Sequence, residues 1–156
     1  MLEIDIPGFG AVKLQHLVTD YTGTLSFDGK LVPGVKDRLI KLSDFLNIHV
    51  LTSDTFGTAI TELKDIPCTA HVLEGEYHDL QKEEYVEKLG SASVVAFGNG
   101  NNDRKMLRVA RIGIAVAGGE GCAVDILMAG DVHVKSILDG LDLLLNPRRL
   151  KATLRY

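Results

Sequence analysis

Short apolar runs alternate with amphipathic stretches through most of this chain, and this alternation most constrains its fold. Runs rich in Val, Ile and Leu predict buried strands, and apolar residues three and four positions apart predict helices with one buried face. The expected strands are 2–6, 12–19, 48–51, 70–73, 94–97, 112–116 and 132–134, and the expected helices are 35–47, 55–64, 79–89, 106–110 and 137–145. Such an order predicts an α/β fold, a parallel sheet with helices on both faces. A chain of 156 residues fits one domain, residues 1–156.

The stretch Leu17-Val18-Thr19-Asp20-Tyr21-Thr22-Gly23-Thr24-Leu25 ends an apolar run in an aspartate, followed by a turn of small residues. Ligands bind beyond the carboxyl ends of the strands in open α/β sheets. An aspartate in that position can act as a nucleophile or a metal ligand. The alternative is that Asp20 only caps a turn.

Four motifs, in order, resemble those of the haloacid dehalogenase-like (HAD) phosphotransferases. Residues 20–24, DYTGT, resemble the first motif, DxxGT, in the DxTGT variant of P-type ATPases. Residues 50–54, VLTSD, resemble the second, and Lys82 resembles the third. Residues 97–107, FGNGNNDRKML, resemble the fourth, GDGxNDxxxL in P-type ATPases. The chain most closely resembles the soluble, P-type-ATPase-like phosphatases of this superfamily.

The resemblance implies a Mg²⁺-dependent phosphohydrolase or phosphotransferase with a Rossmann-like parallel sheet. Asp20 would attack phosphorus and form an aspartyl-phosphate, which splits one difficult displacement into two easier ones. Asp20, the backbone carbonyl of Thr22 and Asp103 would hold the Mg²⁺ ion, with Asn99 beside them.

Substrate binding is also implied by the resemblance. The Thr52 hydroxyl would donate a hydrogen bond to a phosphoryl oxygen, and Lys82 would neutralise charge on the transferring group. Ser53 and Gly23 complete the expected phosphate-binding set.

Two residues depart from the family pattern. Most HAD phosphatases have a second aspartate two residues after the nucleophile as general acid and base, but this chain has Thr22. We therefore expect slow hydrolysis of alkyl phosphates and less impairment with aryl phosphates, acyl phosphates and phosphoanhydrides. Asn99 stands where the family usually has an aspartate, so we expect weaker Mg²⁺ binding.

The spacing of the motifs leaves no room for a cap domain. The interval from Asp20 to Thr52 holds one helix and a hairpin, or flap, whose turn is the Asp-Gly of residues 27–30. The interval from Thr52 to Lys82 holds little more than a helix and a strand. An open site suits a large phosphorylated macromolecule, a small phosphorylated substrate turned over slowly, or a homo-oligomer in which a second subunit supplies the lid.

Charge and composition exclude several classes of protein. A net charge of −4 argues against general nucleic-acid binding. The acidic amino terminus and the absence of a long apolar run predict a cytoplasmic protein without a membrane span. The two cysteines, Cys68 and Cys122, lack metal-binding spacing and are expected to be buried and inert. The basic stretch after Pro147 is expected to be a solvated tail.

Three alternatives remain beside an active phosphatase. Thr22 and Asn99 could mark an attenuated phosphate- or metal-binding or regulatory module of the same fold. A transporter fragment is disfavoured, because the chain has neither membrane helices nor a nucleotide-binding insertion. A histidine metal site is disfavoured, because the five histidines are scattered without ligand spacing; they are His16, His49, His71, His78 and His133.

Overall fold

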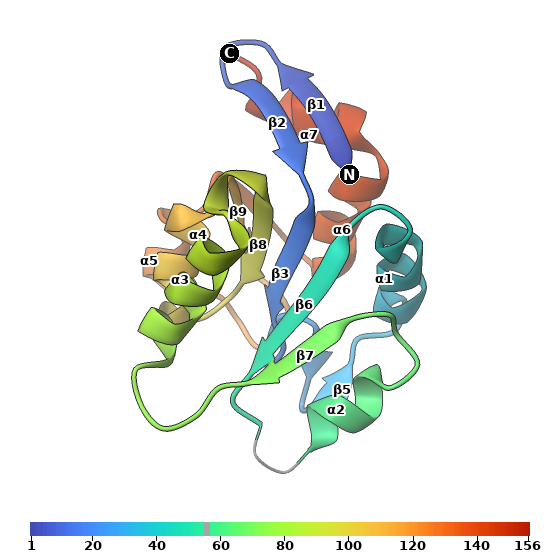
Figure 1. Cartoon of the computed structure of the whole chain (residues 1–156), viewed down its shortest axis with the longest axis vertical. Helices are drawn as coiled ribbons and strands as arrows, with labels where there is room; N and C mark the ends of the chain where they lie inside the picture. Colours follow the sequence, from blue (N-terminus) through green and yellow to red (C-terminus); the bar gives the residue numbers. More distant parts are fainter. Residues whose placement is uncertain (55–56) are drawn as a thin grey trace.

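The computed structural model describes residues 1–54 and 57–156, and its central feature is a six-stranded parallel sheet (Figure 1). The strand order is β10-β9-β8-β3-β6-β7. The strands are β3 (His16–Asp20), β6 (Asn47–Thr52), β7 (Thr69–Val72), β8 (Val94–Gly98), β9 (Ile112–Val116) and β10 (Val132–Val134). Every strand of this sheet had been expected from the apolar runs, so the predicted α/β fold is confirmed.

Helices cover both faces of the sheet (Figure 1). One face carries α3 (His78–Leu89), α4 (Arg104–Val109) and α5 (Val124–Leu127), and their apolar residues form one buried cluster. The other face carries α1 (Val35–Ser43) and α6 (Ile137–Leu145), which belong to a second cluster. The first predicted helix is shorter than expected, since α1 ends at Ser43 and Asn47 already belongs to β6.

The amino-terminal part of the chain forms a separate two-stranded hairpin, β1 (Leu2–Ile6) and β2 (Gly10–Leu14). The expected strand 12–19 is divided at Gln15, whose backbone N–H donates to Ser93 (2.8 Å) and whose carbonyl accepts from Asn47 (2.9 Å). The chain therefore leaves the hairpin and enters the main sheet at one residue.

The basic residues after Pro147 are solvated as expected, but the stretch is not a free tail, because it forms an unexpected helix, α7 (Pro147–Leu154). Leu150 is fully buried, and α7 packs against α6 and β1. Pro147 at the first helical position favours this start, since its missing N–H has no helical partner there. Arg148 and Arg149 of this helix are exposed, and so is Arg155, which follows its last residue.

The flap is a small hairpin of β4 (Ser26–Phe27) and β5 (Lys30–Leu31). Its turn residues, Asp28 and Gly29, have φ angles of 50° and 80°, as a tight hairpin turn requires. The next helix along the chain after β6 is α2 (Thr58–Leu63), and its expected start at residue 55 or 56 lies outside the described residues. Within the described chain, the two intervals between motifs hold only the flap, α1, α2 and β7, so neither contains a cap domain.

No helix among the described residues is long and apolar enough to cross a membrane. Cys68 and Cys122 are free thiols. They are half-buried and not fully buried as expected, and burial raises the pKa of both thiols. A raised pKa keeps a thiol protonated and poorly reactive.

Candidate active site

Asp20 occupies the carboxyl end of β3, the strand between β6 and β8. Parallel pairing with both neighbours aligns the ends of the three strands, so the second motif at the end of β6 and the fourth after β8 lie on either side of Asp20. Asp20 as a whole residue is only 7% exposed. The Thr24 hydroxyl lies 3.3 Å from Asp20 Oδ2 and 3.1 Å from Asn99 Oδ1, so its single hydrogen is shared between these two acceptors and helps to orient the carboxylate.

Lys82 reaches this carboxylate from the first turns of α3. Its side chain is 1% exposed, and Nζ donates to Asp20 Oδ1 (2.7 Å) and to Asp103 Oδ1 (2.6 Å). A lysine is almost never buried this fully unless it is paired. The expectation that Lys82 points from its helix into the crevice is therefore correct.

Asp103 is fully buried beside Asp20, and its second oxygen is held by backbone groups. Oδ2 accepts from the N–H groups of Asn99 and Gly100, both at 3.0 Å. A Cβ atom at position 98 would lie 2.4 Å from Asp103 Cβ, so Asp103 can pack here only because residue 98 is glycine. The turn of the fourth motif thus positions Asp103 through two hydrogen bonds from backbone N–H groups, and glycine at position 98 leaves the space for its side chain.

Two carboxylates share one ammonium group, so Asp20, Asp103 and Lys82 together carry a formal charge of −1. Burial and the charge of Asp103 raise the pKa of Asp20 to about 7, although Lys82 and Thr24 act in the opposite direction. Burial lowers the pKa of Lys82, but the two carboxylates outweigh it and the net shift is upward.

This uncompensated negative charge fits a bound cation. Mg²⁺ is bound through one or two carboxylates and keeps several water ligands. Asp20 and Asp103 offer two carboxylates for such an ion, and the Thr22 carbonyl as a third oxygen stays a prediction. The described residues contain no cluster of three or more His, Cys, Asp or Glu that could hold a metal, so a fully protein-coordinated site is not formed there.

The second motif contributes two hydroxyl groups. Thr52 is 1% exposed, and its Oγ1 accepts a hydrogen bond from the Asp54 N–H (3.0 Å). Because the oxygen accepts this bond, its own hydrogen can be donated to a phosphoryl oxygen. Ser53 is exposed and lines a cavity of about 380 Å³ together with Tyr21 and Thr22.

Asn99 joins two loops through its amide group. Its Oδ1 accepts from Thr24 Oγ1 (3.1 Å), and its Nδ2 donates to the Gly121 carbonyl (3.1 Å). Gly23 has a φ of 76°, and a Cβ there would lie 2.5 Å from Asn99 Nδ2. Gly23 therefore lets the nucleophile turn pass close to the fourth motif.

The structure links Asp20, Lys82 and Asp103 directly, and the other predicted site residues lie at the same end of the sheet. Sequence reasoning missed two contributors, Thr24 and Asn102, whose Oδ1 lies 3.4 Å from Lys82 Nζ. Thr24 is the last residue of the first motif, so the motif itself could have indicated that Thr24 lies beside Asp20. Asn102 had no signal of its own beyond its place in the fourth motif.

The histidines are not scattered as expected, because three of them gather around Tyr85 of α3. His16 Nδ1 and His49 Nε2 are 3.1 Å apart, and His49 Nδ1 lies 3.0 Å from the Tyr85 hydroxyl. The His71 ring lies 5.2 Å from the Tyr85 ring. These contacts connect β3, β6 and β7 to α3, one helical turn from Lys82, so they help to hold the helix that carries the lysine.

His49 makes stability depend on pH. It is 9% exposed, and burial together with the neighbouring His16 lowers its pKa to about 4. The pKa of His49 is lower in the folded than in the unfolded chain, so protonation favours the unfolded chain. The contribution of neutral His49 to folding stability is therefore complete above about pH 6.5, the ordinary histidine pKa, and is lost as the pH falls toward 4. We expect His49 to account for about 2 kcal/mol of the stability lost between pH 7.5 and pH 4.5. Urea unfolding at both pH values should show a smaller loss for His49→Gln than for the wild type.

The matched control for this measurement is His133→Gln, because His133 is an exposed histidine on β10. It should lose as much stability as the wild type. Equal pH dependence in His49→Gln and the wild type would contradict the assignment.

Comparisons with known proteins agree with this geometry. The family model described as haloacid dehalogenase-like hydrolase matches residues 79–123. An uncharacterised protein of Methanocaldococcus jannaschii is 47% identical over 73 residues, which cover 47% of this chain and 78% of that protein.

The solved structures that share the fold include two phosphatases. The cobalt-bound deoxy-D-mannose-octulosonate 8-phosphate phosphatase of Haemophilus influenzae has a TM-score of 0.72 at 13% identity and covers 92% of this chain and 94% of its own. The second is the 3-deoxy-D-manno-octulosonate 8-phosphate phosphatase of Moraxella catarrhalis, in complex with magnesium, phosphate and KDO. Its TM-score is 0.64 at 19% identity, and the match covers 91% of this chain and 94% of that protein. The segment matched by the family model contains both Lys82 and Asp103, so sequence similarity and geometry concern the same residues. The chain belongs to the haloacid dehalogenase-like hydrolases.

Proposed function

We propose that this protein is a Mg²⁺-dependent phosphohydrolase that works through an aspartyl-phosphate on Asp20. The observation that carries the proposal is the buried Lys82 ammonium, which donates to both Asp20 and Asp103 at the carboxyl end of the sheet. A buried cation between two acids, one of them at a strand end, suits a site that must bind and transfer an anionic group. The similar fold of a phosphatase solved with magnesium and phosphate supports this reaction class.

The reaction has two steps. In the first, an Asp20 carboxylate oxygen bonds to phosphorus while the bond to the leaving group breaks and the leaving oxygen takes the electron pair. In the second, water attacks the same phosphorus, which releases phosphate and restores the Asp20 carboxylate. When bound by Asp20, Asp103 and the Thr22 carbonyl, Mg²⁺ supplies neutralising charge to the phosphoryl oxygens.

The surrounding residues serve both steps. Lys82 offsets negative charge on the transferring group, and the Thr52 hydroxyl can donate to one of its oxygens. The Thr24 hydroxyl keeps the Asp20 carboxylate oriented. The test of the function is hydrolysis of p-nitrophenyl phosphate and acetyl phosphate, which should require Mg²⁺, cease with a chelator and return when Mg²⁺ is restored. Hydrolysis that persists in the chelator would count against the proposal.

The Thr22 side chain sets the preference for leaving groups. It is exposed on the rim of the cavity lined by Ser53 and Tyr21, two residues from the nucleophile, but it cannot donate a proton as an acid near neutral pH. Aryl phosphates should therefore react faster than alkyl phosphates. We expect Thr22→Asp to raise kcat/KM for an alkyl phosphate by about 100-fold, the lower part of the range for positioned proton transfer.

The control is Thr22→Asn, which has nearly the same shape as the aspartate variant and no acidic proton. It should leave the alkyl phosphate rate near the wild-type value. Equal gains in the Asn and Asp variants would show that shape and not proton transfer limits the reaction.

The second candidate function is an attenuated binding or regulatory module. It is favoured by Asn99, whose amide is engaged by Thr24 and Gly121 where a carboxylate usually stands. Mg²⁺ binding without phosphoryl transfer to Asp20 would favour this function over the phosphatase.

The partner that we propose is a small phosphorylated molecule, in the manner of the soluble P-type-ATPase-like phosphatases that the first motif resembles. A second copy of the chain could cover the open crevice. Light scattering that finds only monomer would exclude that assembly.

A further inference from the structure

Asn99 and Gly100 form the one Asn-Gly pair of the sequence, although the chain has five asparagines. In such a pair the backbone nitrogen of the glycine can attack the side-chain carbon Cγ of the asparagine, because the covalent bonds between them keep the two atoms close. Glycine favours the attack, since it has no Cβ to shield its nitrogen. Asn99 is therefore the asparagine of this chain most prone to deamidation.

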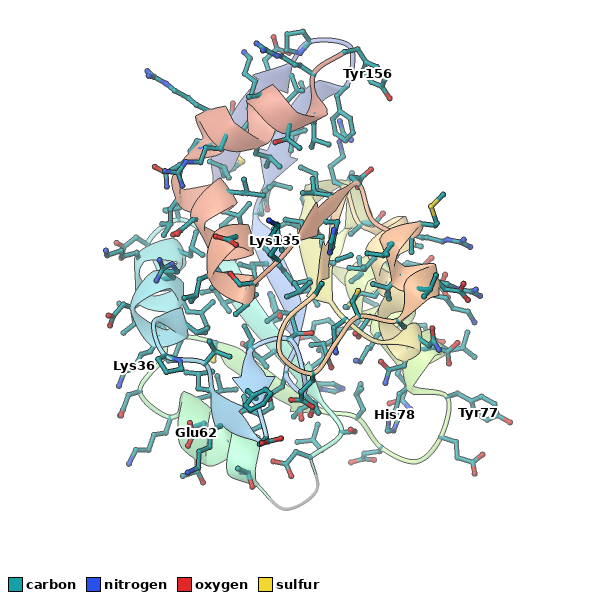
Figure 2. The ribbon with its side chains drawn as sticks, turned by 180° about the vertical axis from the view of Figure 1, so that it is seen from behind. Lys36, Glu62, Tyr77, His78, Lys135 and Tyr156 are labelled. Carbon is teal, nitrogen blue, oxygen red and sulfur yellow. The ribbon has the colours of Figure 1, made fainter. Side chains whose placement is uncertain are left out.

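In the folded chain, both ends of the Asn99 amide are held. Its Oδ1 lies 3.1 Å from the Thr24 hydroxyl, and its Nδ2 donates to the Gly121 carbonyl (3.1 Å). Gly121 belongs to the loop between β9 and α5, which Figure 2 shows as the pale orange loop below Lys135. Attack by the Gly100 nitrogen would draw Cγ toward the backbone and away from Thr24 and Gly121, so both contacts oppose it.

The attacking nitrogen is held as well. The Gly100 N–H donates to Asp103 Oδ2 (3.0 Å), and the attack would remove this hydrogen. Asp103 is fully buried, and its other oxygen accepts from Lys82 Nζ (2.6 Å) on α3. The acceptor that restrains Gly100 is thus itself fixed by a helix on one face of the sheet. The reactivity of Asn99 therefore depends on the integrity of the active site.

We propose that Asn99 is a self-modification site, closed while the turn of residues 98–103 is intact and open when that turn loosens. Both Asn99 and Gly100 are half-buried, so water reaches them once the turn opens. Gly100 N then bonds to Asn99 Cγ, the Cγ–Nδ2 bond breaks, and Nδ2 leaves as ammonia with the hydrogen from Gly100. Water adds to one carbonyl of the resulting succinimide, the ring C–N bond breaks, and the nitrogen takes back a hydrogen from that water.

The two possible products have opposite effects on the site. Addition of water at Cγ gives aspartate, the residue that the family usually has at this position. Addition at the backbone carbonyl gives isoaspartate, which lengthens the backbone just before Gly100 and displaces the N–H that holds Asp103. Either change is irreversible, so the modification records that the turn has opened. It does not require the phosphatase function, whereas its effect on Mg²⁺ binding does.

The test follows the mass of the peptide that contains residue 99 during incubation at pH 8, in buffer and in concentrated urea. In urea the wild type should convert Asn99 to both products. In buffer the conversion should be at least about tenfold slower, because the turn must first open.

Gly100→Ala tests the attacking nitrogen. A Cβ at position 100 would lie 3.5 Å from Asn102 Oδ1 and 3.8 Å from Asp103 Oδ2, which are ordinary contact distances, so the fold accommodates it. Because this Cβ shields the nitrogen, Asn99 should stay unconverted in urea over the period in which the wild type reacts.

Thr24→Val tests the protection by the fold, since it removes the hydroxyl beside Asn99 Oδ1 and keeps the branched side chain. In buffer it should convert Asn99 about threefold faster than the wild type, as the loss of one weak hydrogen bond implies. Thr153→Val, the same substitution at an exposed threonine of α7, is the control and should react at the wild-type rate.

Each other result overturns a definite part of the proposal. An unreactive Asn99 in urea would show that this residue is not a modification site. Equal rates in buffer and in urea, or in Thr24→Val and the wild type, would show that the contacts of the folded turn do not protect it. Undiminished conversion in Gly100→Ala, with aspartate as the sole product, would show that water attacks the amide directly and that no succinimide forms.

Discussion

Asp20→Asn is expected to lower turnover by about 10,000-fold or more and to abolish the phosphoenzyme, since removal of a covalent nucleophile has effects of this size. The amide is a poor nucleophile and carries no charge. Its nitrogen would also face the Lys82 ammonium if it replaced the oxygen that now accepts that bond at 2.7 Å. Both consequences concern the same step, the formation of the bond to phosphorus.

Intact-mass measurement after incubation with Mg²⁺ and acetyl phosphate tests this result. The wild type should gain one phosphoryl group that hydroxylamine removes, and the variant should gain none. Asp65→Asn is the matched control, because Asp65 is an exposed acid that pairs with the surface residue Lys36. It should be phosphorylated like the wild type. A hydroxylamine-sensitive adduct on Asp20→Asn would show that another residue is the nucleophile.

Lys82→Met should affect both activity and stability. Loss of one buried donor to a transferring group costs about 100- to 1,000-fold in kcat. Removal of the ammonium also leaves Asp20 and Asp103 buried without their counter-charge, which we expect to cost about 3–5 kcal/mol in unfolding free energy without Mg²⁺. Because Mg²⁺ binds the folded state, adding it should recover part of the lost stability.

The pH dependence of this loss has a definite sign. Burial and Asp103 already raise the pKa of Asp20 to about 7, and removal of Lys82 raises it further. A raised carboxyl pKa gives stability that is present at low pH and is lost as pH rises, so the destabilisation by Lys82→Met should be larger at pH 8 than at pH 5. Urea unfolding at both pH values, with and without Mg²⁺, measures it. Lys88→Met, at an exposed position of the same helix, is the control and should be nearly neutral. Unchanged stability in Lys82→Met would contradict a charge-balancing role for Lys82.

The sequence was sufficient for the parallel sheet and for the central residues of the site. Val94 to Phe97 and Ile112 to Val116 are apolar on both sides, as strands covered on both faces must be. A strand end and a motif together were enough to place Asp20, and a motif on an amphipathic helix was enough for Lys82. The positions of these residues follow the prediction because local pattern and tertiary position agree at those points, and their catalytic roles stay predictions.

Other features depend on contacts between distant segments. His16, His49 and Tyr85 are 33 and 36 residues apart along the chain, and only strand register and helix packing bring them together. The basic stretch after Pro147 has few apolar residues, so its helix could be recognised only once β1 and α6 were present to bury Leu150.

The two ends of the sheet should differ in how well they tolerate sequence changes. The chain enters the sheet at Gln15, at the end that carries the hairpin of β1 and β2. The hairpin of β1 and β2, together with α7, extends from the amino ends of the strands, whereas the flap and α2 lie at the opposite end (Figure 1). Variation in the hairpin would alter how firmly the sheet is anchored without entering the path of a substrate. Every insertion at the flap end would meet an incoming molecule first, so new specificities can arise there while the hairpin end stays constant.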